Sequence, residues 1–349
     1  MFKEKIPCAL LVNDIHVSKD SIPEFQKNWE EMLEICKAQD IKEIIIGGDL
    51  LQSRSSYQTL DVLLAVRQAI IKATNAGLTL TIAEGNHDLV DQEAILGYCH
   101  IFSEYPNVYV VDDYTAMEFG DDVMLYTMSY APENGSFTSR LQDILDNDFD
   151  ADKYNILYIH EGIRGGLAMP SDDELPTKIF KDFDAVLVGH YHNRCKIKGT
   201  NIEYIGASRQ HNFGEDEEKG YTILYTDGSY EFVKNQANTR YKVIDLSLQD
   251  VDSNLIDELN DIKADGKYKV KARINCSETD VQNVDKQKLL EAGAAKVEIV
   301  TEKTVAKSIE AHSLDRKFDK TGIKQEYESF CSEKVIDSSM GLQYLDKIH

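Results

Sequence analysis

The sequence alternates between apolar runs and polar stretches, and each long apolar run in the first part of the chain ends at a polar motif. Successive side chains of a strand point to opposite faces, so a run that is apolar throughout indicates a strand covered on both faces. The runs that follow this pattern throughout or for the most part are Cys8–Val12, Ile44–Ile46, Leu78–Ala83, Ile156–Ile159 and Val186–Val188.

Helical periodicity occupies two of the intervals between these runs. Between Ser21 and Gln39 the apolar residues fall on one side of a helix, and Thr59–Asn75 is a second helical segment, closed by Gly77. Because buried strands alternate with helices, the first part of the chain is predicted to be α/β.

Shorter apolar runs follow. Glu203–Ile205, Tyr221–Thr226 and Tyr230–Val233 predict an antiparallel hairpin region, and Asp227-Gly228 is a turn signal between the last two. A polar stretch at residues 234–240 then predicts a domain boundary.

Beyond this boundary the pattern predicts a second, smaller α/β unit. Leu255–Ile262 has helical spacing, Val270–Ile274 alternates as a strand, a short helix ends at Gly293, and Val297–Val300 is a strand. We therefore expect a domain of residues 1–234, a small domain of residues 241–302, and a helical segment over residues 303–349.

Composition places this architecture in a broad class. The chain has 349 residues, of which 42% are hydrophobic, enough for one large core and a smaller one. No run approaches the roughly 18 to 20 apolar residues of a membrane span, and residues 1–13 have the pattern of a first strand, not of a secretory signal. Six widely spaced cysteines without a C-x-x-C pair favour a cytoplasmic protein, or a host-cytoplasmic one if the gene belongs to a phage.

The formal net charge of −23 argues against strong intrinsic binding to DNA, because Lys and Arg are the main contacts to phosphate backbones. Part of the acidity belongs to candidate metal ligands, however. The acidic runs at residues 143–152 and 215–218 are expected to be solvated faces.

The polar motifs that follow the apolar runs contain residue types that bind metals. They are Asp14-Ile15-His16, Gly48-Asp49, Gly85-Asn86-His87-Asp88, His160 and Gly189-His190-Tyr191-His192. Residues two apart on a strand share a face, so Asp14 and His16 are expected to point the same way. In layered α/β proteins, ligands gather outside the strand ends, and we expect all the motifs to meet there.

Imidazole and carboxylate donors without sulfur suit Mn, Fe or Zn better than Ca or Mg. Two divalent ions about 3.5 to 4 Å apart need a bridging carboxylate, for which Asp49 is the candidate. Asn86 would add an uncharged oxygen, and His87 would lie over the substrate and protonate a leaving oxygen. Taken alone, His160 would more often be an ordinary core or surface histidine.

The order of these blocks, D-x-H, G-D, G-N-H-D, H and G-H-x-H, resembles the calcineurin-like metallophosphoesterases. Tyr204–Ser208, Phe213-Gly214-Glu215 and Lys219-Gly220-Tyr221 further resemble the region after the last metal motif in SbcD-type DNA repair and recombination nucleases. The resemblance covers residues 7–234. It implies an α/β fold, a layered sandwich of β-sheets flanked by helices with a small C-terminal α/β cap domain.

Carried over residue by residue, the resemblance gives one divalent ion the ligands Asp14, His16, Asp49 and His192, and a second ion the ligands Asp49, Asn86, His160 and His190. His87 becomes the acid of the transition state, and Asp88 orients it through a hydrogen bond. The two ions, most often Mn²⁺, would activate water for attack on phosphorus.

Several positions depart from the family pattern or lie near the substrate without a clear role. Leu51 and Gln52 replace an aromatic residue and an Asp or His, which leaves a role for Gln52 beside the substrate open, and Asn13 stands where Gly or Ala is more usual. Arg164 could bring a cation to a phosphate, although Arg164-Gly165-Gly166 fits a simple turn better. Arg209 and His211 lie in a loop where a substrate-facing role competes with a solvated one.

The resemblance also implies partners: DNA, an SMC-like ATPase of the SbcC type, and a second copy of the chain in a homodimer. No membrane is expected to be involved. Residues 304–349 are highly charged with scattered apolar positions. This segment would be either a helix that docks into a groove of the ATPase or a helix that packs on its own cap domain.

Two functions remain open at this point. The first is a metal-dependent DNA nuclease subunit, with exonuclease and single-strand endonuclease activity, in an SbcCD-like complex. The second is a stand-alone metallophosphoesterase acting on a nucleotide, cyclic nucleotide or phosphoprotein. The predicted cap and residues 206–220 favour the nuclease, whereas the acidic balance favours the second. An inactive scaffold would be expected to have lost a ligand, and every ligand position is present.

Overall fold

The structure is a computed structural model of the chain, and it describes residues 5–52, 57–90, 97–131, 136–167 and 174–301 with Tyr327, Cys331, Ser338 and Leu342. The chain divides into two compact units, residues 1–242 with 266–269 and residues 243–265 with 270–349. Apart from those four single residues, the predicted segment 303–349 lies outside the described residues.

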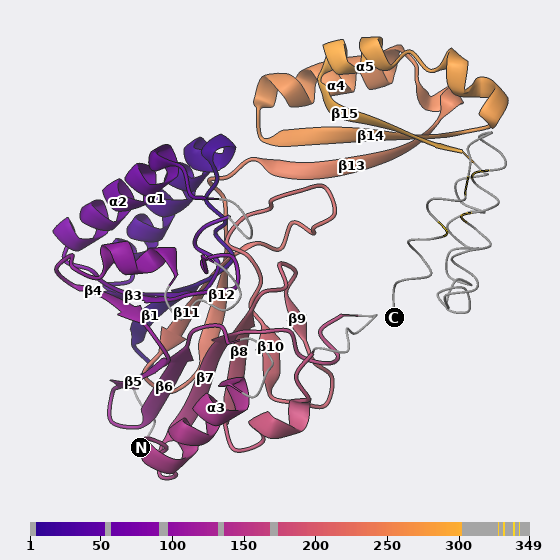
Figure 1. Cartoon of the computed structure of the whole chain (residues 1–349). Helices are drawn as coiled ribbons and strands as arrows, with labels where there is room; N and C mark the ends of the chain where they lie inside the picture. The colour runs from indigo at the N-terminus through magenta and orange to yellow at the C-terminus, as the bar shows by residue number, and fades with distance from the viewer. Residues whose placement is uncertain are drawn as a thin grey trace. The chain divides into compact units, whose positions relative to one another are not determined.

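The first unit contains two six-stranded sheets (Figure 1). In the first sheet the strands lie in the order β12-β11-β1-β2-β3-β4. The four strands β1 to β4 are parallel, and β11 is antiparallel to both β1 and β12. Their bounds are β1 Pro7–Val12, β2 Glu43–Gly47, β3 Thr79–Ala83, β4 Val108–Val111, β11 Gly220–Tyr225 and β12 Tyr230–Lys234.

The second sheet has the order β5-β6-β7-β8-β10-β9. Its strands are β5 Tyr114–Phe119, β6 Val123–Met128, β7 Tyr154–His160, β8 Ala185–Gly189, β9 Cys195–Lys196 and β10 Ile202–Tyr204. The sequence placed Glu203–Ile205 with the antiparallel hairpin, which is wrong. Strand β10 instead pairs in parallel with β8, and only β11 and β12 return to the first sheet as the predicted hairpin.

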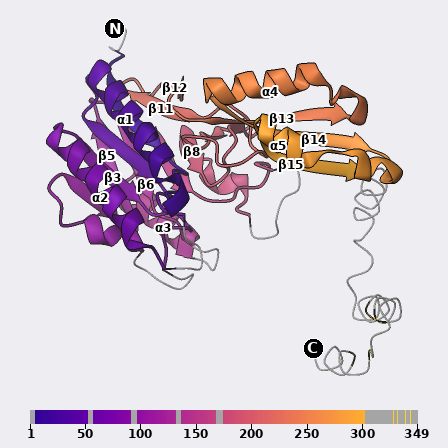
Figure 2. The ribbon, with the colours of Figure 1, turned by 90° about the horizontal axis from the view of Figure 1, so that it is seen from above.

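Three α-helices flank the sheets: α1 Ile22–Ala38, α2 Leu60–Asn75 and α3 Ser136–Asn147. Helices α1 and α2 lie side by side over the first sheet (Figures 1 and 2). Helix α3 covers the outer face of the second sheet. The helices α1 and α2 begin and end within one residue of the ranges that the sequence predicts.

The two faces of β1 show how the layers form. Leu10 and Val12 pack with the residues of α1 and α2, while Ala9 and Leu11 pack in the core between the two sheets. All four side chains are almost fully buried, and a buried side chain of the size of Leu or Val contributes about 1.5 to 3 kcal/mol to folding. The predicted α/β sandwich of sheets flanked by helices is confirmed.

The second unit contains a three-stranded sheet of β13 Arg240–Ser247, β14 Tyr268–Cys276 and β15 Ala294–Thr301, with helices α4 Ser253–Asp265 and α5 Lys286–Ala292. In β14, Val270, Ala272 and Ile274 are buried and their neighbours are not, which matches the predicted alternation.

Short 3₁₀ helices occur in both units and cover Lys19–Ser21, Tyr98–Phe102, Thr177–Phe180, Leu248–Asp250 and Glu278–Asn283.

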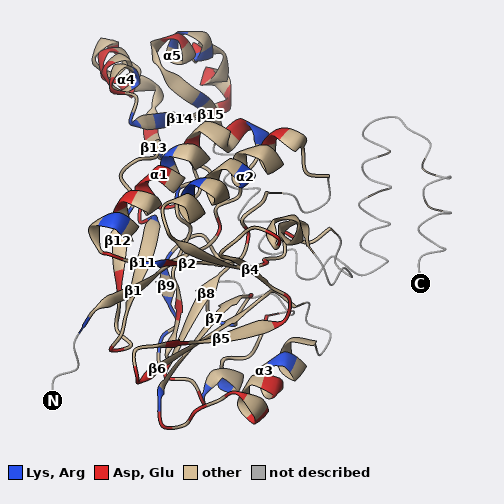
Figure 3. Cartoon of the chain, turned by 90° about the vertical axis from the view of Figure 1, so that its left-hand side faces the viewer, with Lys and Arg blue, Asp and Glu red and all other residues tan. Residues whose placement is uncertain are grey.

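Charged residues are spread along the helices. Figure 3 shows Lys and Arg interspersed with Asp and Glu on α1, α4 and α5. None of the helices among the described residues is long and apolar enough to cross a membrane.

Candidate metal centre

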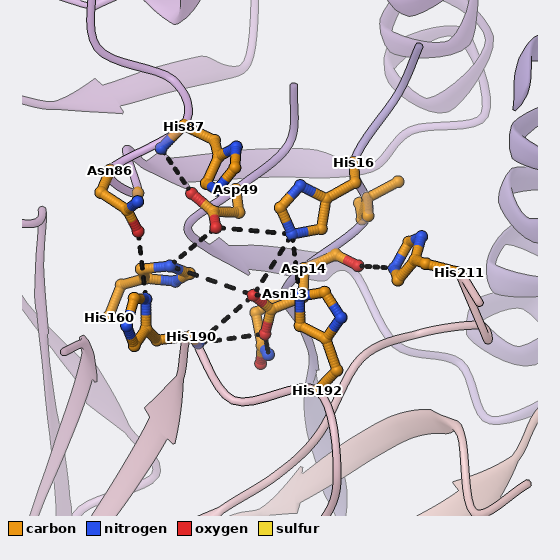
Figure 4. A network of polar contacts seen from close by, with 12 residues as sticks. Asn13, Asp14, His16, Asp49, Asn86, His87, His160, His190, His192 and His211 are labelled. Carbon is orange, nitrogen blue, oxygen red and sulfur yellow. Dashed lines mark hydrogen bonds and ion pairs between the residues drawn. The ribbon is translucent and has the colours of Figure 1, made fainter. Parts of the chain in front are cut away.

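The predicted ligand motifs all lie at or just after the carboxyl ends of strands. Strands β1, β2 and β3 of the first sheet lead into Asp14, Asp49 and Asn86, while β7 and β8 of the second sheet lead into His160 and His190. Because the strands within each group are parallel, these ends point toward the same edge of the sandwich. The side chains converge there (Figure 4).

The backbone at this edge adopts an unusual conformation. Asp14, His16, Asp49 and His190 have positive φ angles of 51°, 49°, 54° and 91°. Such angles cost of order 1 to 3 kcal/mol each for residues other than glycine and persist only where the surroundings enforce them. Here the Asp14 N–H donates to the Gly48 carbonyl at 3.1 Å and the His16 N–H to the Asp49 carbonyl at 3.0 Å.

Asp14 and His16 lie close together, as the sequence predicts, but not because of strand alternation. Strand β1 ends at Val12, so strand alternation does not align the two side chains. They converge because two left-handed residues bend the segment alongside the loop after β2. His16 Nε2 lies 3.7 Å from Asp14 Oδ1.

Three overlapping groups of side chains have the geometry of metal-binding sites among the described residues. They are Asp14 with His16 and His192, His16 with Asp49 and His87, and Asp49 with His160 and His190. Within each group the ligand atoms lie within 4.8 Å of one another. The first group contains three of the four residues of one predicted ligand set, and the third group contains three of the four residues of the other.

Asp49 links the groups. Its Oδ2 lies 3.5 Å from His16 Nε2 and 3.1 Å from His160 Nε2, so one oxygen faces a histidine of each predicted set. Its Oδ1 accepts a hydrogen bond from the His87 N–H at 2.8 Å. This is the geometry expected of a bridging carboxylate.

Hydrogen bonds orient two of the histidine rings. His160 Nδ1 lies 3.0 Å from the Gly47 carbonyl, and His192 Nδ1 lies 2.8 Å from Glu215 Oε1. A carbonyl or carboxylate oxygen can only accept, so in both rings Nδ1 carries the hydrogen and Nε2 faces the centre. His190 Nδ1, in turn, lies 3.1 Å from Asn86 Oδ1, which brings the amide into the same group.

The electrostatics of the centre favour bound positive charge. Burial opposes charging of Asp14, but His16, His160 and His192 hold the pKa of its carboxyl well below the usual range. Burial likewise opposes charging of Asp49, yet mainly His160 lowers the pKa of this carboxyl to about 2. Against the effect of burial, Asp49 raises the pKa of His160 to about 10.

The residues fit a bound divalent cation. His16 Nε2 and His192 Nε2 lie 3.1 Å apart, and both belong to the group with Asp14. Donor atoms on one ion at about 2.1 Å, with angles of about 90° to 109°, are separated by about 3.0 to 3.4 Å. The spacing of these nitrogens is therefore that of two ligands on one ion.

His87 lies beside this centre, but Asp88 does not have the predicted contact. His87 Nδ1 lies 3.2 Å from the Gln52 carbonyl. The buried Asp88 carboxylate instead accepts hydrogen bonds from the N–H groups of Leu50, Leu51 and Gly85. Asp88 thus joins the loops after β2 and β3 instead of orienting His87. Burial, together with the charges of Asp49 and Glu84, raises the pKa of the Asp88 carboxyl to about 8.

Two of the predicted substrate-proximal residues lie at the surface. The Gln52 side chain is exposed, and its backbone carbonyl is the group that faces His87. Arg164 is also exposed, in a turn closed by a hydrogen bond from the Gly166 N–H to the Ile163 carbonyl. The turn interpretation of this segment is the one that the structure supports.

Arg209 is buried and His211 is half-buried, and both contact the segment that carries Asp14 and His16, so neither is a solvated loop residue. Arg209 is 4% exposed and donates to the carbonyls of Ile15 and His16. His211 Nε2 lies 2.8 Å from the Asp14 carbonyl, and its ring packs on those of His16 and His192. Burial and the nearby Arg209 hold the pKa of His211 well below its usual value.

Sequence reasoning missed two further residues. Glu215 was assigned to a solvated acidic run, yet its side chain is 7% exposed and contacts His192. Asn13 was noted only as a departure from the family pattern, but its amide donates to Asp14 and to the Gly206 carbonyl. A signal existed for Glu215, since it belongs to the quoted Phe213-Gly214-Glu215 segment.

Comparison with known proteins agrees with the site. The family model for calcineurin-like phosphoesterases matches residues 9–194, just over half of the chain. The matched region includes every predicted metal ligand. The chain belongs to the calcineurin-like phosphoesterase family, whose metal dependence agrees with the groups of His and Asp described above.

Within this family the chain is similar to SbcD-type nucleases. It is 26% identical over 222 residues to the SbcD component of the SbcCD nuclease of Staphylococcus saprophyticus subsp. saprophyticus. The aligned region covers 56% of this chain and 58% of that protein, so the chain spans less than two thirds of the relative's length.

Solved structures with some likeness include the crystal structure of Pseudomonas putida nuclease MPE, with 15% identity, a TM-score of 0.29, and coverage of 63% of this chain and 84% of that chain. Another is the family 1 b-glucosidase from Thermotoga maritima, with 10% identity, a TM-score of 0.26, and coverage of 86% and 89%. At TM-scores this low, neither likeness supports a conclusion about fold or activity.

Proposed function

We propose that this protein is the nuclease component of an SbcCD-like DNA repair and recombination complex. It would hydrolyse phosphodiester bonds of DNA as an exonuclease and a single-strand endonuclease with two divalent ions, most often Mn²⁺. The observation that carries the proposal is the set of overlapping Asp and His groups, linked through Asp49, beside His87. Similarity to an SbcD-type nuclease supports DNA as the substrate.

The proposed ligand sets are Asp14, His16, Asp49 and His192 for one ion and Asp49, Asn86, His160 and His190 for the other. When bound, such a pair supplies charge neutralisation at the phosphate and an activated water. His87 would protonate the leaving oxygen. With its Nδ1 facing the Gln52 carbonyl at 3.2 Å, the doubly protonated ring of His87 would give the proton from Nε2.

The remaining parts of the chain receive roles by the same proposal. Residues 1–234 would form the nuclease domain and residues 241–302 a cap that recognises DNA. Residues 303–349 would dock on an SMC-like ATPase of the SbcC type, which would supply the grip on DNA that a net charge of −23 does not favour. The six free cysteines support a reducing, cytoplasmic location.

A homodimer is also part of the proposal. In the first turns of α2, Leu60 and Leu64 are 68% and 40% exposed, and Tyr57, three residues before the helix, is 91% exposed. Leu60 and Leu64, four apart on a helix, lie on one stripe, and exposed apolar patches mark contacts between chains. This stripe is the proposed contact between two copies.

The net charge favours a second candidate, a stand-alone metallophosphoesterase for a nucleotide, cyclic nucleotide or phosphoprotein. Both candidates share the same metal ligands and differ in substrate. A direct comparison of substrates therefore separates them.

The test is cleavage of end-labelled linear duplex DNA, circular single-stranded DNA and a small phosphodiester by purified protein with Mn²⁺, with and without chelator. Asp49→Asn removes the proposed bridge, and Asp121→Asn, at an exposed position in the turn between β5 and β6, is the matched control. We expect DNA cleavage that the chelator abolishes and that falls at least about 100-fold in Asp49→Asn only. Hydrolysis of the small ester with intact DNA would contradict the nuclease and support the second candidate.

A further inference from the structure

The two anchored histidines of the metal centre are held in different ways. His160 Nδ1 faces the backbone carbonyl of Gly47 at 3.0 Å, inside the fully buried end of β7. His192 Nδ1 faces the side chain of Glu215, with Oε1 at 2.8 Å. One anchor is thus part of the sheet, whereas the other is a single side chain from a loop.

The loop holds the Glu215 carboxylate in place. Oε2 accepts a hydrogen bond from the His211 N–H at 3.0 Å, and Oε1 accepts one from Asn212 Nδ2 at 2.8 Å. The Gln210 amide also donates to the Glu215 carbonyl at 3.0 Å. Because donors from its own loop hold both oxygens, the carboxylate presents a fixed acceptor to His192.

The neighbouring acidic residues make different contacts. Asp216 pairs with Lys219 at 2.7 Å, Glu217 with Arg240 at 3.2 Å, and Glu218 with Lys234 at 2.5 Å. Glu215 alone of this acidic run has its described ion pair with a histidine. Its charge therefore acts on the centre, while the other three charges act on Lys219, Arg240 and Lys234.

We propose that Glu215 is a positioning residue that fixes the tautomer and the orientation of His192, so that one of the two ion sites depends on this loop and the other does not. The inference rests on the two-ion site proposed above. In a neutral imidazole, a carboxylate that accepts from one ring nitrogen keeps the hydrogen there, so the lone pair of the other nitrogen faces the ion and becomes more basic. Its loss would let the His192 ring turn and would spread the hydrogen over both nitrogens.

The predicted effect is selective. Removing a hydrogen-bond partner of a ligating histidine typically weakens metal binding about 10- to 100-fold. In Glu215→Ala this loss should fall on the site with Asp14, His16 and His192. The site with His160 and His190 should change less than about twofold, because its anchor is a backbone carbonyl. Glu215→Gln keeps an oxygen acceptor but no charge and should lie between wild type and Glu215→Ala.

The experiment is titration calorimetry of the metal-free full chain with Mn²⁺, on wild type, Glu215→Ala, Glu215→Gln and the control Glu218→Gln. Glu218 lies in the same loop and has the same charge, but it pairs with Lys234. Wild type should show two Mn²⁺-binding transitions, and Glu218→Gln should show the same two with the same affinities. One weakened and one unchanged transition are expected in Glu215→Ala.

Nitrogen NMR of the histidines in metal-free protein supplies a second readout. Wild type should show His192 with hydrogen on Nδ1, and Glu215→Ala should show a mixture of tautomers. An unchanged His192 tautomer, or equal weakening of both ion sites, would overturn the role of Glu215. If wild type binds fewer than two ions, the two-ion proposal fails by itself, and the NMR comparison still decides the contact between Glu215 and His192.

Discussion

At the scale of single residues, the metal centre depends on glycines that leave room for ligands. A Cβ on Gly85 would lie 2.2 Å from Asp49 Oδ1, and a Cβ on Gly48 would lie 2.4 Å from His160 Nδ1. Gly48 also has a φ of +102°, which side-chain-bearing residues rarely adopt. Small residues beside the ligands thus leave the space in which the ligands lie.

Gly48→Ala should therefore destabilise the protein through two effects, the strained backbone and displacement of His160 from the Gly47 carbonyl. The matched control is Gly77→Ala, because Gly77 has a φ of +82° but nothing within 4 Å of the added Cβ. We expect a loss of about 1 kcal/mol for Gly77→Ala and of about 3 kcal/mol or more for Gly48→Ala. Urea unfolding of the metal-free proteins measures both, and equal losses would contradict the proposed crowding at His160.

At the scale of elements, the first turn of α1 is joined to the polar segment that precedes β13. Glu24 accepts hydrogen bonds from the Thr239 N–H at 2.9 Å, from the Thr239 hydroxyl at 3.1 Å and from the Asn238 amide. Burial by itself would raise the pKa of Glu24. The bond from Lys27 and the bonds from Asn238 and Thr239 outweigh it and lower this pKa to about 2. The contact therefore requires the charged carboxylate.

This contact predicts a pH-dependent effect of Glu24→Gln. The pKa of Glu24 is lower in the folded protein than the value of about 4.3 expected for the unfolded chain. Its charged form therefore stabilises the fold fully at pH values above about 4.3, and this contribution declines as the pH falls toward 2. We expect Glu24→Gln to cost about 1 to 2 kcal/mol at pH 7. The difference from wild type should be constant down to about pH 5 and shrink below it.

Urea unfolding across this pH range measures the effect of Glu24→Gln. The control is Glu34→Gln, at an exposed position on the same helix, which should change stability by less than about 0.5 kcal/mol at any pH. A difference between Glu24→Gln and wild type that stayed constant to about pH 3 would show that the charge of Glu24 is not what holds residues 238–239.

Elements also differ in how well their sequence predicts them. The strands before the metal motifs are apolar at most positions because both faces are covered, and the sequence predicts them at nearly their observed bounds. Strand β5, at the edge of the second sheet, has no fully buried residue, and no apolar run marks it. Edge strands and short helices such as α3 bury less surface, so their patterns carry less information.

At the scale of the whole molecule, the chain consists of two units with separate cores. The second unit buries Val270, Ala272 and Ile274 of β14 with Leu259 and Leu289. If the units fold independently, as the proposed nuclease and cap domains require, damage to one core should leave the site in the other unchanged.

Ile274→Ala tests this independence. Ile274 is fully buried, and its truncation should cost about 2 to 5 kcal/mol within the second unit. Mn²⁺ affinity, measured by calorimetry, should stay within about twofold of wild type. Leu187→Ala, in the equally buried β8 of the first unit, is the comparison and should weaken metal binding. Comparable weakening by Ile274→Ala would reject independent units.

The sequence by itself determined the fold class, most of the inner strands, the identity of the ligand-type residues and their order along the chain. It could do so because the burial of a strand and the chemistry of a side chain are local properties, visible within a few residues. The tertiary structure alone decided that the ligands come from two different sheets and that left-handed backbone, not strand alternation, brings Asp14 and His16 together.

The roles of the supporting residues were also decided only in three dimensions. Four supporting residues contact the ligands or the loops that carry them, although their positions in a catalytic motif, a loop or an acidic run do not predict these contacts. They are Asp88, Arg209, His211 and Glu215. Their partners are distant in the chain, since Arg209 reaches the carbonyl of Ile15 and His211 that of Asp14. Such contacts depend on how the layers pack, and no local pattern records which residues that packing brings together.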